Sequence, residues 1–303
     1  MTEPIEQTAS IQSHGKWADI WAQFRHNKGA LFGGILFILI VAIVMLGPLF
    51  WHLEANTIDI RARNQGASWA HPLGTDQLGR DTFARLIAGG QTSISVGLTA
   101  MILSLFLGSF IGVLAGFYKG LDGLLMRMTD MFLSLPLLPL LLVMMLLFRD
   151  LLSQSFGPER GMFILIVFAI GITSWMPTAR IVRADVLAIK EREFILAARS
   201  VGLGDAALIL RHILPNVFSP IMVSATLGIA NAIITESALY FLGLGFPPDV
   251  PTWGRLLNDG VEYLQLYPGR AIWPGLAISL TVLSVNYLGD GLRDALDPRS
   301  RER

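Results

Sequence analysis

Long apolar runs separated by short polar segments dominate the chain. A helix needs about 20 apolar residues to cross the ~30 Å hydrocarbon core of a membrane. Runs of this kind, the fourth shorter than the others, lie at residues 30–51, 94–117, 129–147, 162–177, 217–241 and 272–288. The first is too long for a signal-peptide core, and no small-residue cleavage site follows it. The pattern therefore predicts an all-α membrane protein with six transmembrane helices, the first of them uncleaved.

A different pattern precedes the first run. Trp17, Ile20, Trp21 and Phe24 are spaced i, i+3, i+4 and i+7, as on one face of a helix. Basic residues flank the segment, so this helix could lie in the membrane interface; the alternative is that it packs against the spans. We divide the chain into an N-terminal tail with this amphipathic helix (1–29), a transmembrane domain (30–290) and a C-terminal tail (291–303).

The polar segments differ in charge. With the N-terminus inside, 15 of the 23 Lys and Arg residues fall in inside segments and 8 in outside segments. The positive-inside rule favours this orientation, which makes both termini cytoplasmic. The outside segments then include a turn-rich loop at 52–91, and the inside segments include a basic loop at 179–216.

Composition supports a membrane protein and narrows its functions. Hydrophobic residues make up 53% of the 303 residues and charged residues only 15%, against ~25% charged in a typical soluble domain. The net charge of zero removes the global basic field expected of a nucleic-acid-binding protein. The absence of cysteine excludes disulfides, thiolate metal ligands and cysteine nucleophiles.

Catalytic motifs are missing from the sequence. There is no Walker A loop, so the chain cannot hold ATP in the P-loop manner. Residues 202–207 fit GxGxxA, but the segment before them is predicted to be a helix and not the strand that this fingerprint requires. No GxSxG elbow occurs, and the five histidines form no HExxH pair. We predict no catalytic residue, no metal site and no enzymatic activity.

Polar and small residues within or beside the spans suggest contacts. Gly108, Gly112 and Gly116 lie four apart and allow another helix to approach closely, as a subunit contact, a moving seam or ordinary packing within the chain. Glu236 is the one acidic residue inside a confident span, and we favour a hydrogen-bonded structural acid over a proton or substrate role. Arg127 and Asp130, spaced i, i+3, are predicted to pair locally.

The basic loop at 179–216 is predicted to form two helices. The first spans residues 179–201 and is broken by Gly202 and Gly204. Asp205 is predicted to cap a short second helix over 206–212, which Pro215 ends. An exposed helix–turn–helix of this shape can dock in a groove on another protein. The alternative is a hairpin that only connects two spans.

This loop resembles the EAA loop of the inner-membrane subunits of ABC importers. The resemblance rests on Ala197-Ala198, on Gly202 four residues later and on Leu214-Pro215. Leu196 stands where the family pattern has Glu, and His212 stands where it has Ile, so an ion pair made by that Glu is not carried over.

Other segments are similar to the dipeptide/oligopeptide permease group. They comprise HPLGTDQLGRD at 71–81, Met126-Arg127 with Asp130, Ala179-Arg180 with Val182-Arg183, RHILPN at 211–216, Glu236-Ser237-Ala238 and FLGLG at 241–245. FRHNK at 24–28 resembles the start of the C-type member of that group. The resemblance extends over residues 24–298.

The resemblance implies a type I ABC importer permease that forms half of a translocation pore in the bacterial inner membrane. Expected partners are a homologous second permease, two cytoplasmic ATPases, an extracytoplasmic substrate-binding protein and membrane lipid, with no nucleic acid. The ATPases would use ATP and Mg, and this chain would bind no cofactor. In the family, the loop helix sits in a cleft on the ATPase and transmits its closure to the spans. The substrate stays open among peptides, nickel, opines and glutathione.

The resemblance also suggests site residues. The ATPase-docking loop would include Glu193, Ala197, Ala198, Gly202, Gly204, Asp205, Leu214 and Pro215. A gate or pathway on the outer side would include Glu236, Gly243 and Gly245. The alternative function is a stand-alone secondary transporter or channel, which predicts intramembrane ionisable residues and paired broken helices.

Overall fold

The computed structural model describes residues 16–296, and every regular element in that range is helical. One isolated bridge, between Thr75 and Asp81, is the only β-type pairing there. The helices are α1 (Lys16–His26), α2 (Lys28–Phe50), α3 (Thr82–Phe117), α4 (Lys119–Ser134), α5 (Leu137–Phe156), α6 (Pro158–Ser174), α7 (Met176–Lys190), α8 (Glu193–Ser200), α9 (Asp205–Leu208), α10 (Leu214–Phe241), α11 (Trp253–Val261) and α12 (Gly269–Leu296). A 3₁₀ turn, η1 (Ile60–Ala62), and a π-helix, η2 (Ile209–Ile213), complete the set.

Five helical stretches in this range are long and apolar enough to cross a membrane, and a sixth span is the bent pair α6–α7. The six-helix prediction therefore agrees with the structure. The predicted span at 129–147 is instead broken between α4 and α5 at Leu135 and Pro136, because proline cannot donate the hydrogen bond that a continuous helix requires. Helix α5 packs on α6, and α4 packs on α7. The broken pair α4–α5 therefore runs alongside the bent pair α6–α7.

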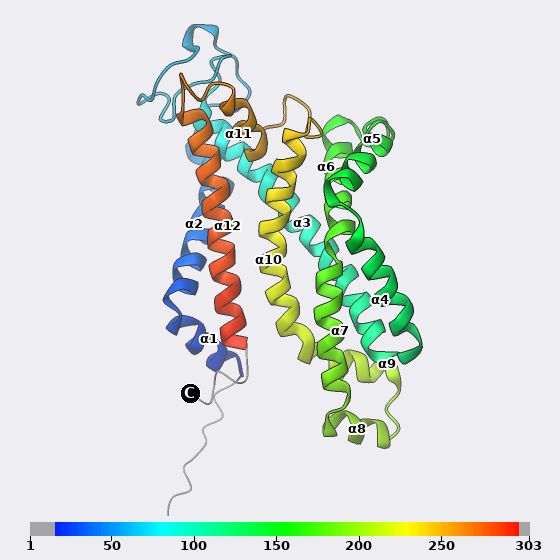
Figure 1. Cartoon of the computed structure of the whole chain (residues 1–303). Coiled ribbons are helices and arrows are strands. Elements are labelled where there is room, and N and C mark those ends of the chain that lie inside the picture. Colours follow the sequence, from blue (N-terminus) through cyan, green and yellow to red (C-terminus); the bar gives the residue numbers. More distant parts are fainter. Residues whose placement is uncertain (1–15, 297–303) are drawn as a thin grey trace, which may run out of the picture.

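The helices form an elongated bundle (Figure 1). The α2–α12 pair lies on one side, α4 to α7 lie on the other, α10 stands between them, and α3 crosses behind them on a diagonal. At 1.5 Å per residue, the 36 residues of α3 extend about 54 Å, which is longer than the hydrocarbon core and agrees with its steep tilt. The 52–81 segment and α11 lie at one end, while α1, α8 and the end of α12 lie at the other.

The glycine stripe on α3 packs against α7 within the chain. A Cβ at Gly112 would lie 2.7 Å from the carbonyl oxygen of Ala179, and one at Gly116 would lie 2.7 Å from Cβ of Val186. The third glycine, Gly108, meets Thr178 and the Trp175 carbonyl in the same way. Ordinary intrachain packing, the plainest of the three interpretations, therefore explains the spacing.

The predicted amphipathic segment forms α1, which packs on α12. Trp21 and Phe24 stack with ring centroids 5.9 Å apart, and a Cβ at Gly291 would lie 3.3 Å from the Phe24 ring. Trp21 remains exposed. The helix thus contacts the spans through one side and presents an aromatic ring on another. The side chains of Trp17 and Ile20 lie outside the described residues.

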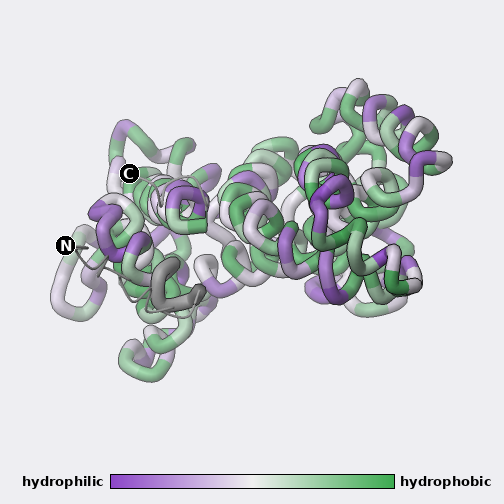
Figure 2. The backbone as a smooth tube through the Cα atoms, turned by 90° about the horizontal axis from the view of Figure 1, so that it is seen from below, coloured by the Kyte–Doolittle hydropathy of each residue, from purple (hydrophilic) through white to green (hydrophobic). Residues whose placement is uncertain are grey.

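Apolar residues cover the outside of the bundle as well as its interior. The tube in Figure 2 is coloured hydrophobic along most of its helical length, and Ile35, Ile38 and Leu49 of α2 are each more than 60% exposed. Exposed apolar area of this extent is unfavourable in water and is typical of a surface that meets lipid.

Two helix ends differ from the predicted boundaries. α3 begins at Thr82, nine residues before the predicted end of the outer loop at 91, because the Asp81 carboxylate accepts the Ala84 N–H at 2.6 Å and caps the helix. α12 runs to Leu296, beyond the predicted start of the C-terminal tail at 291. Polar residues such as Asp290 and Arg293 continue the helix past the apolar run, which hydropathy alone does not reveal.

Candidate functional site

The loop between α7 and α10 folds into a small helical hairpin anchored by one apolar side chain. Ile195 of α8 is almost fully buried among Val113 and Phe117 at the end of α3, Val186 of α7 and Leu208 of α9. The predicted single helix over 179–201 is therefore wrong, because the chain bends at Glu191 and Arg192. In a continuous helix, residues six apart such as Ile189 and Ile195 would point about 120° apart; the bend lets both reach one cluster.

Gly202 ends α8 in a complete Schellman motif. Its φ is +83°, the left-handed conformation that glycine adopts without strain. The Gly202 N–H donates to Arg199 O at 3.0 Å, and the Leu203 N–H donates to Ala198 O at 3.1 Å. These two bonds define the motif and satisfy carbonyls that the helix end leaves free. The turn predicted at Gly202 is present, and its conformation explains the glycine.

Gly204 and Asp205 do not have the helix-breaking and helix-capping roles that the sequence predicted for them. Gly204 has φ −69° and ψ 156°, an extended conformation open to any residue, and no atom lies within 4 Å of a Cβ built there. Gly204, and not Asp205, is the N-cap of α9, and no side chain caps that helix. The predicted Asp205 cap is therefore wrong; Asp205 is the first helical residue, where its charge favours the helix dipole.

Pro215 does not end a helix, contrary to the prediction. α9, η2 and α10 form one continuous helical stretch from Asp205 to Phe241. Just before the proline the helix widens, because the Leu214 N–H bonds to Ile209 O five residues back. This π turn makes room for the proline ring, and the Asn216 amide donates to His212 O at 2.6 Å.

The surface of α8 that faces away from the bundle mixes apolar side chains with the exposed polar residues Glu193, Arg199 and Ser200. Phe194, Leu196 and Val201 are exposed, Val201 by 85%, and Ala197 lies among them. Glu193 is exposed at the first position of α8, Ala198 is half-buried, and Leu214 is exposed nearby. A groove of about 750 Å³ opens beside the helix and is lined by Asp185, Ala188, Ile189, Glu191, Arg192, Glu193, Phe194 and Asn216.

The hairpin is tied to the bundle through α7. Lys190 Nζ donates to Phe117 O at 2.7 Å at the end of α3. Arg183 holds Asp122 of α4 through two hydrogen bonds, one of 2.7 Å, and the bond from Arg183 lowers the pKa of the Asp122 carboxyl. Asp130 pairs with Arg180 of α7 and not with Arg127, so the predicted local pair is corrected.

A buried polar cluster organises the opposite end of the molecule. Asp76 Oδ2 accepts Arg80 Nε at 2.6 Å and Arg85 Nη1 at 2.8 Å, while Oδ1 accepts the N–H groups of Arg80 and Leu78. Burial raises the pKa of Asp76, but these hydrogen bonds and the Arg80 charge outweigh that effect and lower it overall. Arg270 of α12 donates to the Thr75 carbonyl at 2.8 Å and so holds the same loop from the other side.

Glu236 of α10 is buried, with 1% of its surface exposed. Its carboxylate accepts the Ser93 hydroxyl at 3.2 Å, and that hydroxyl oxygen accepts the Trp253 N–H at 3.1 Å. The acid therefore joins α10, α3 and the start of α11. Its other oxygen has no hydrogen-bond partner.

Gly243 and Gly245 follow α10 and serve different purposes. Gly243, with φ +73°, closes a second Schellman motif in which Leu244 N–H donates to Leu239 O at 3.0 Å. A Cβ at Gly245 would lie 2.1 Å from the Tyr240 ring, so the position has no room for a side chain. Both glycines shape the turn from α10 to α11.

Sequence reasoning missed the Asp76–Arg85–Arg270 cluster. The 71–81 segment stood out as turn-rich and as similar to the permease group, and Arg270 lies 194 residues beyond Asp76. The signal available in the sequence was the position of these arginines, which lie just before the apolar runs at 94–117 and 272–288. Within residues 16–296, no three His, Cys, Asp or Glu side chains gather in a way that could hold a metal ion.

Comparison with known proteins identifies the family. Residues 104–302 match the model described as binding-protein-dependent transport system inner membrane component, and residues 15–67 match the N-terminal TM domain of oligopeptide transport permease C. The oligopeptide transport system permease protein OppC of Bacillus subtilis (strain 168) is 36% identical over 97% of this chain and 93% of its own length. The glutathione transport system permease protein GsiD of Pectobacterium atrosepticum is 36% identical over 98% and 95%.

Solved structures show the same fold at lower identity. A crystal structure of an amino acid ABC transporter with histidines superposes with a TM-score of 0.50 and 18% identity, over 69% of this chain and 92% of that one. The inward-facing MetNI methionine ABC transporter gives 0.51 and 17%, over 70% and 96%. The chain therefore belongs to the family of binding-protein-dependent transport system inner membrane components, the multi-pass permease subunits of ABC importers.

Proposed function

We propose that this chain is one of two permease subunits of a peptide importer, and that the hairpin formed by α8 and α9 docks on an ATPase subunit. The observation that carries the docking proposal is the exposure of Phe194, Leu196, Ala197 and Val201 around the outer sides and the end of α8. A helical ridge of this kind beside a groove suits insertion into a cleft of a partner protein. We keep the docking residues that the sequence suggested as part of this proposal. Ala198 lies on the side of α8 that packs against the bundle.

The proposed coupling follows from how α8 is attached. Because Ile195 is packed against α3 and α7, a force on α8 reaches the spans through a rigid contact and not through a flexible linker. The ion pairs of α7 with α4 extend the same path. In this proposal the partner ATPases bind and hydrolyse ATP with Mg, and this chain has no catalytic role.

The homologous second permease would cover the exposed side of α3 and α10. Phe106 and Phe110 stack there, with ring centroids 6.3 Å apart, and both are more than half exposed. They line an apolar groove of about 610 Å³ between α3 and the η2–α10 stretch. We infer one second permease, two ATPases and one extracytoplasmic binding protein per complex, with both termini of this chain in the cytoplasm.

The substrate class is inferred from relatives whose names refer to oligopeptides, dipeptides and glutathione. Uptake of labelled peptides of two to five residues, glutathione and nickel should be compared in cells that carry the whole transport system and in cells that lack this chain. Peptide uptake that requires the chain is the expected result. Uptake of nickel alone would overturn the peptide assignment and leave the importer assignment intact.

Docking can be tested with engineered cysteines, because the chain contains none. An Ala197→Cys variant of the assembled complex, treated with a cysteine-to-amine crosslinker, should couple to the ATPase. Trp69→Cys, at the opposite end and fully exposed, is the control and should not. Membrane-impermeant maleimide should label the Trp69→Cys variant in intact cells and the Ala197→Cys variant only after permeabilisation. The reverse labelling would refute the orientation, and equal crosslinking would refute the docking.

A further inference from the structure

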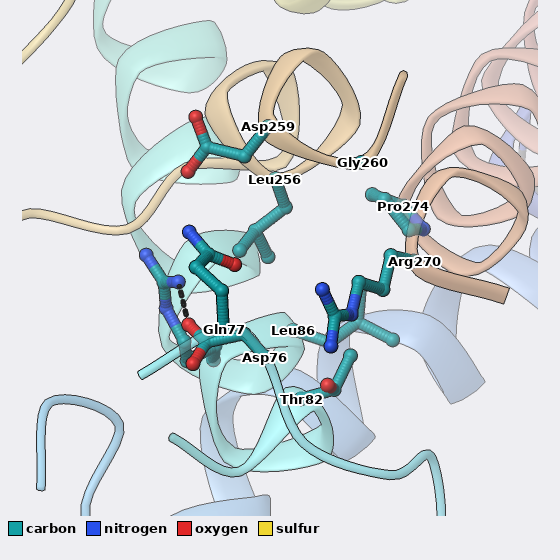
Figure 3. A pocket seen from close by; sticks show the side chains of 10 residues that line it. Asp76, Gln77, Thr82, Leu86, Leu256, Asp259, Gly260, Arg270 and Pro274 are labelled. Atoms are coloured by element: carbon teal, nitrogen blue, oxygen red, sulfur yellow. Dashed lines mark hydrogen bonds and ion pairs between the residues drawn. The ribbon is translucent and has the colours of Figure 1, made fainter. Parts of the chain in front are cut away.

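A small, partly open cavity lies within the polar cluster, between the 71–82 loop, the start of α3, α11 and the start of α12. Figure 3 shows Asp76, Gln77 and Arg270 around this space, with Thr82 below and Asp259 above. The room available to the centre of a water-sized particle is about 20 Å³, which is enough for a single water molecule or a monoatomic ion and too little for a larger solute.

The charges around the cavity do not balance. Arg80 and Arg85 share the single carboxylate of Asp76. Arg270 bonds only neutral oxygens, of Asn64 and Thr75, and stacks on Tyr267 and Tyr263. Asp259 is engaged by Arg255 at 3.4 Å. Counting these groups, the region carries two more positive than negative charges.

Five side-chain atoms of the lining residues Arg85, Arg270 and Thr82 are hydrogen-bond donors without a partner. Arg85 is 2% exposed, and its Nε and Nη2 have no hydrogen-bond partner; Arg270 is 9% exposed, and its Nε and Nη1 have none. The Thr82 hydroxyl, 7% exposed, is also unpartnered and can donate. Buried guanidinium donors without acceptors are unfavourable. A water molecule can donate to the Asp76 and Asp259 carboxylates, which also line the cavity. An anion only accepts, and it alone offsets the excess positive charge.

We propose that this cavity binds a small inorganic anion of chloride size, held by Arg85, Arg270 and Thr82. The ion joins the loop at 71–82, α3 and α12, and adds to the contacts that Asp76 and the Thr75 carbonyl make there. It is buried within one chain, so it is a structural ligand of the outer end and not a transported solute. Its loss loosens the surface formed by the 52–81 segment.

The test uses the purified transport complex in sodium chloride or in sodium gluconate at equal ionic strength. Thermal unfolding of this subunit should shift upward along a saturable curve as chloride or bromide replaces gluconate, because an ion that binds only the folded state stabilises it. Crystals of the complex grown in bromide should give an anomalous difference peak between Thr82 and the two arginines. Identical unfolding in chloride and gluconate with no bromide peak would mean that the cavity holds water and would overturn the proposal.

A matched pair of variants localises the effect. Thr82→Val removes the hydroxyl donor with little change in volume and should raise the half-saturating chloride concentration several-fold. Thr281→Val removes a buried hydroxyl of α12 that bonds to Ala277 O, away from any arginine, and should leave it unchanged. A saturable chloride effect that responds equally to both variants, or to neither, would place the ion elsewhere and refute the site.

Discussion

Replacing Gly202 should loosen α8 without disturbing the rest of the bundle. In the left-handed conformation, an L-residue costs ~1–2 kcal/mol more than glycine, and Gly202 has φ +83° with no neighbour within 4 Å of its missing Cβ. The cost of Gly202→Ala therefore comes from the backbone alone. If α8 avoids the strain by giving up its terminal turn, it also loses two hydrogen bonds, each contributing ~1 kcal/mol. An eight-residue helix has little stability of its own to offset this.

The matched control is Gly204→Ala. Gly204 is also exposed and has open space around it, but its φ of −69° suits any residue. Alanine there should be neutral or should stabilise the fold by ~0.4–1 kcal/mol, since it reduces the freedom of the unfolded chain. Gly202→Asn should fall between wild type and Gly202→Ala, because asparagine tolerates the left-handed region better than alanine does.

Hydrogen exchange of the assembled complex measures the difference. A strain of ~1–2 kcal/mol raises the opening equilibrium of α8 about 5- to 30-fold, so amides at 201–203 should exchange faster by that factor in Gly202→Ala and not in Gly204→Ala. Equal exchange in the two variants would refute the conformational argument. Gly202→Val should in addition reduce transport and ATPase binding; unchanged transport would show that the turn is not needed for coupling.

The remaining predictions concern other contacts. Gly112→Val should destabilise the α3–α7 contact by ~1–3 kcal/mol in thermal unfolding, since a Cβ there lies 2.7 Å from a backbone oxygen, whereas Gly120→Ala, with nothing within 4 Å, should not. Asp76 has a lowered pKa in the folded state, so it stabilises the fold fully above its unfolded pKa of ~3.9, and this stabilisation is lost as pH falls through the lower folded value. Acid unfolding of Asp76→Asn should lack that loss; an unchanged pH profile would contradict it. Leu196→Glu should change ATPase co-purification only modestly, because in this chain an apolar contact of Leu196 takes the place of the charge in the family pattern; a much larger yield of complex for Leu196→Glu than for wild type would show that Leu196 weakens docking.

The helix count and helix ends follow largely from local sequence. Apolar run length predicts the number of spans because a membrane sets a minimum length for each helix. Gly202 and Asp81 mark helix ends because the conformation or hydrogen bond that they supply involves only neighbouring residues. The same local reasoning failed at Pro215, where a π turn lets the helix continue, and at Asp205, where the preceding residue is the cap.

Contacts between distant segments required the folded structure. The α3 glycine stripe is compatible with any close helix partner, and only packing identifies α7. Asp130 pairs with Arg180, 50 residues away, and not with Arg127 in its own helix, because the packing of α7 on α4 brings the two charges together. Arg85 and Arg270, which line the small cavity in the polar cluster, likewise come from distant segments of the chain. Hydropathy and backbone preference act over a few residues and are readable along the chain, whereas the pairing of charges and small residues depends on which helices the fold brings into contact.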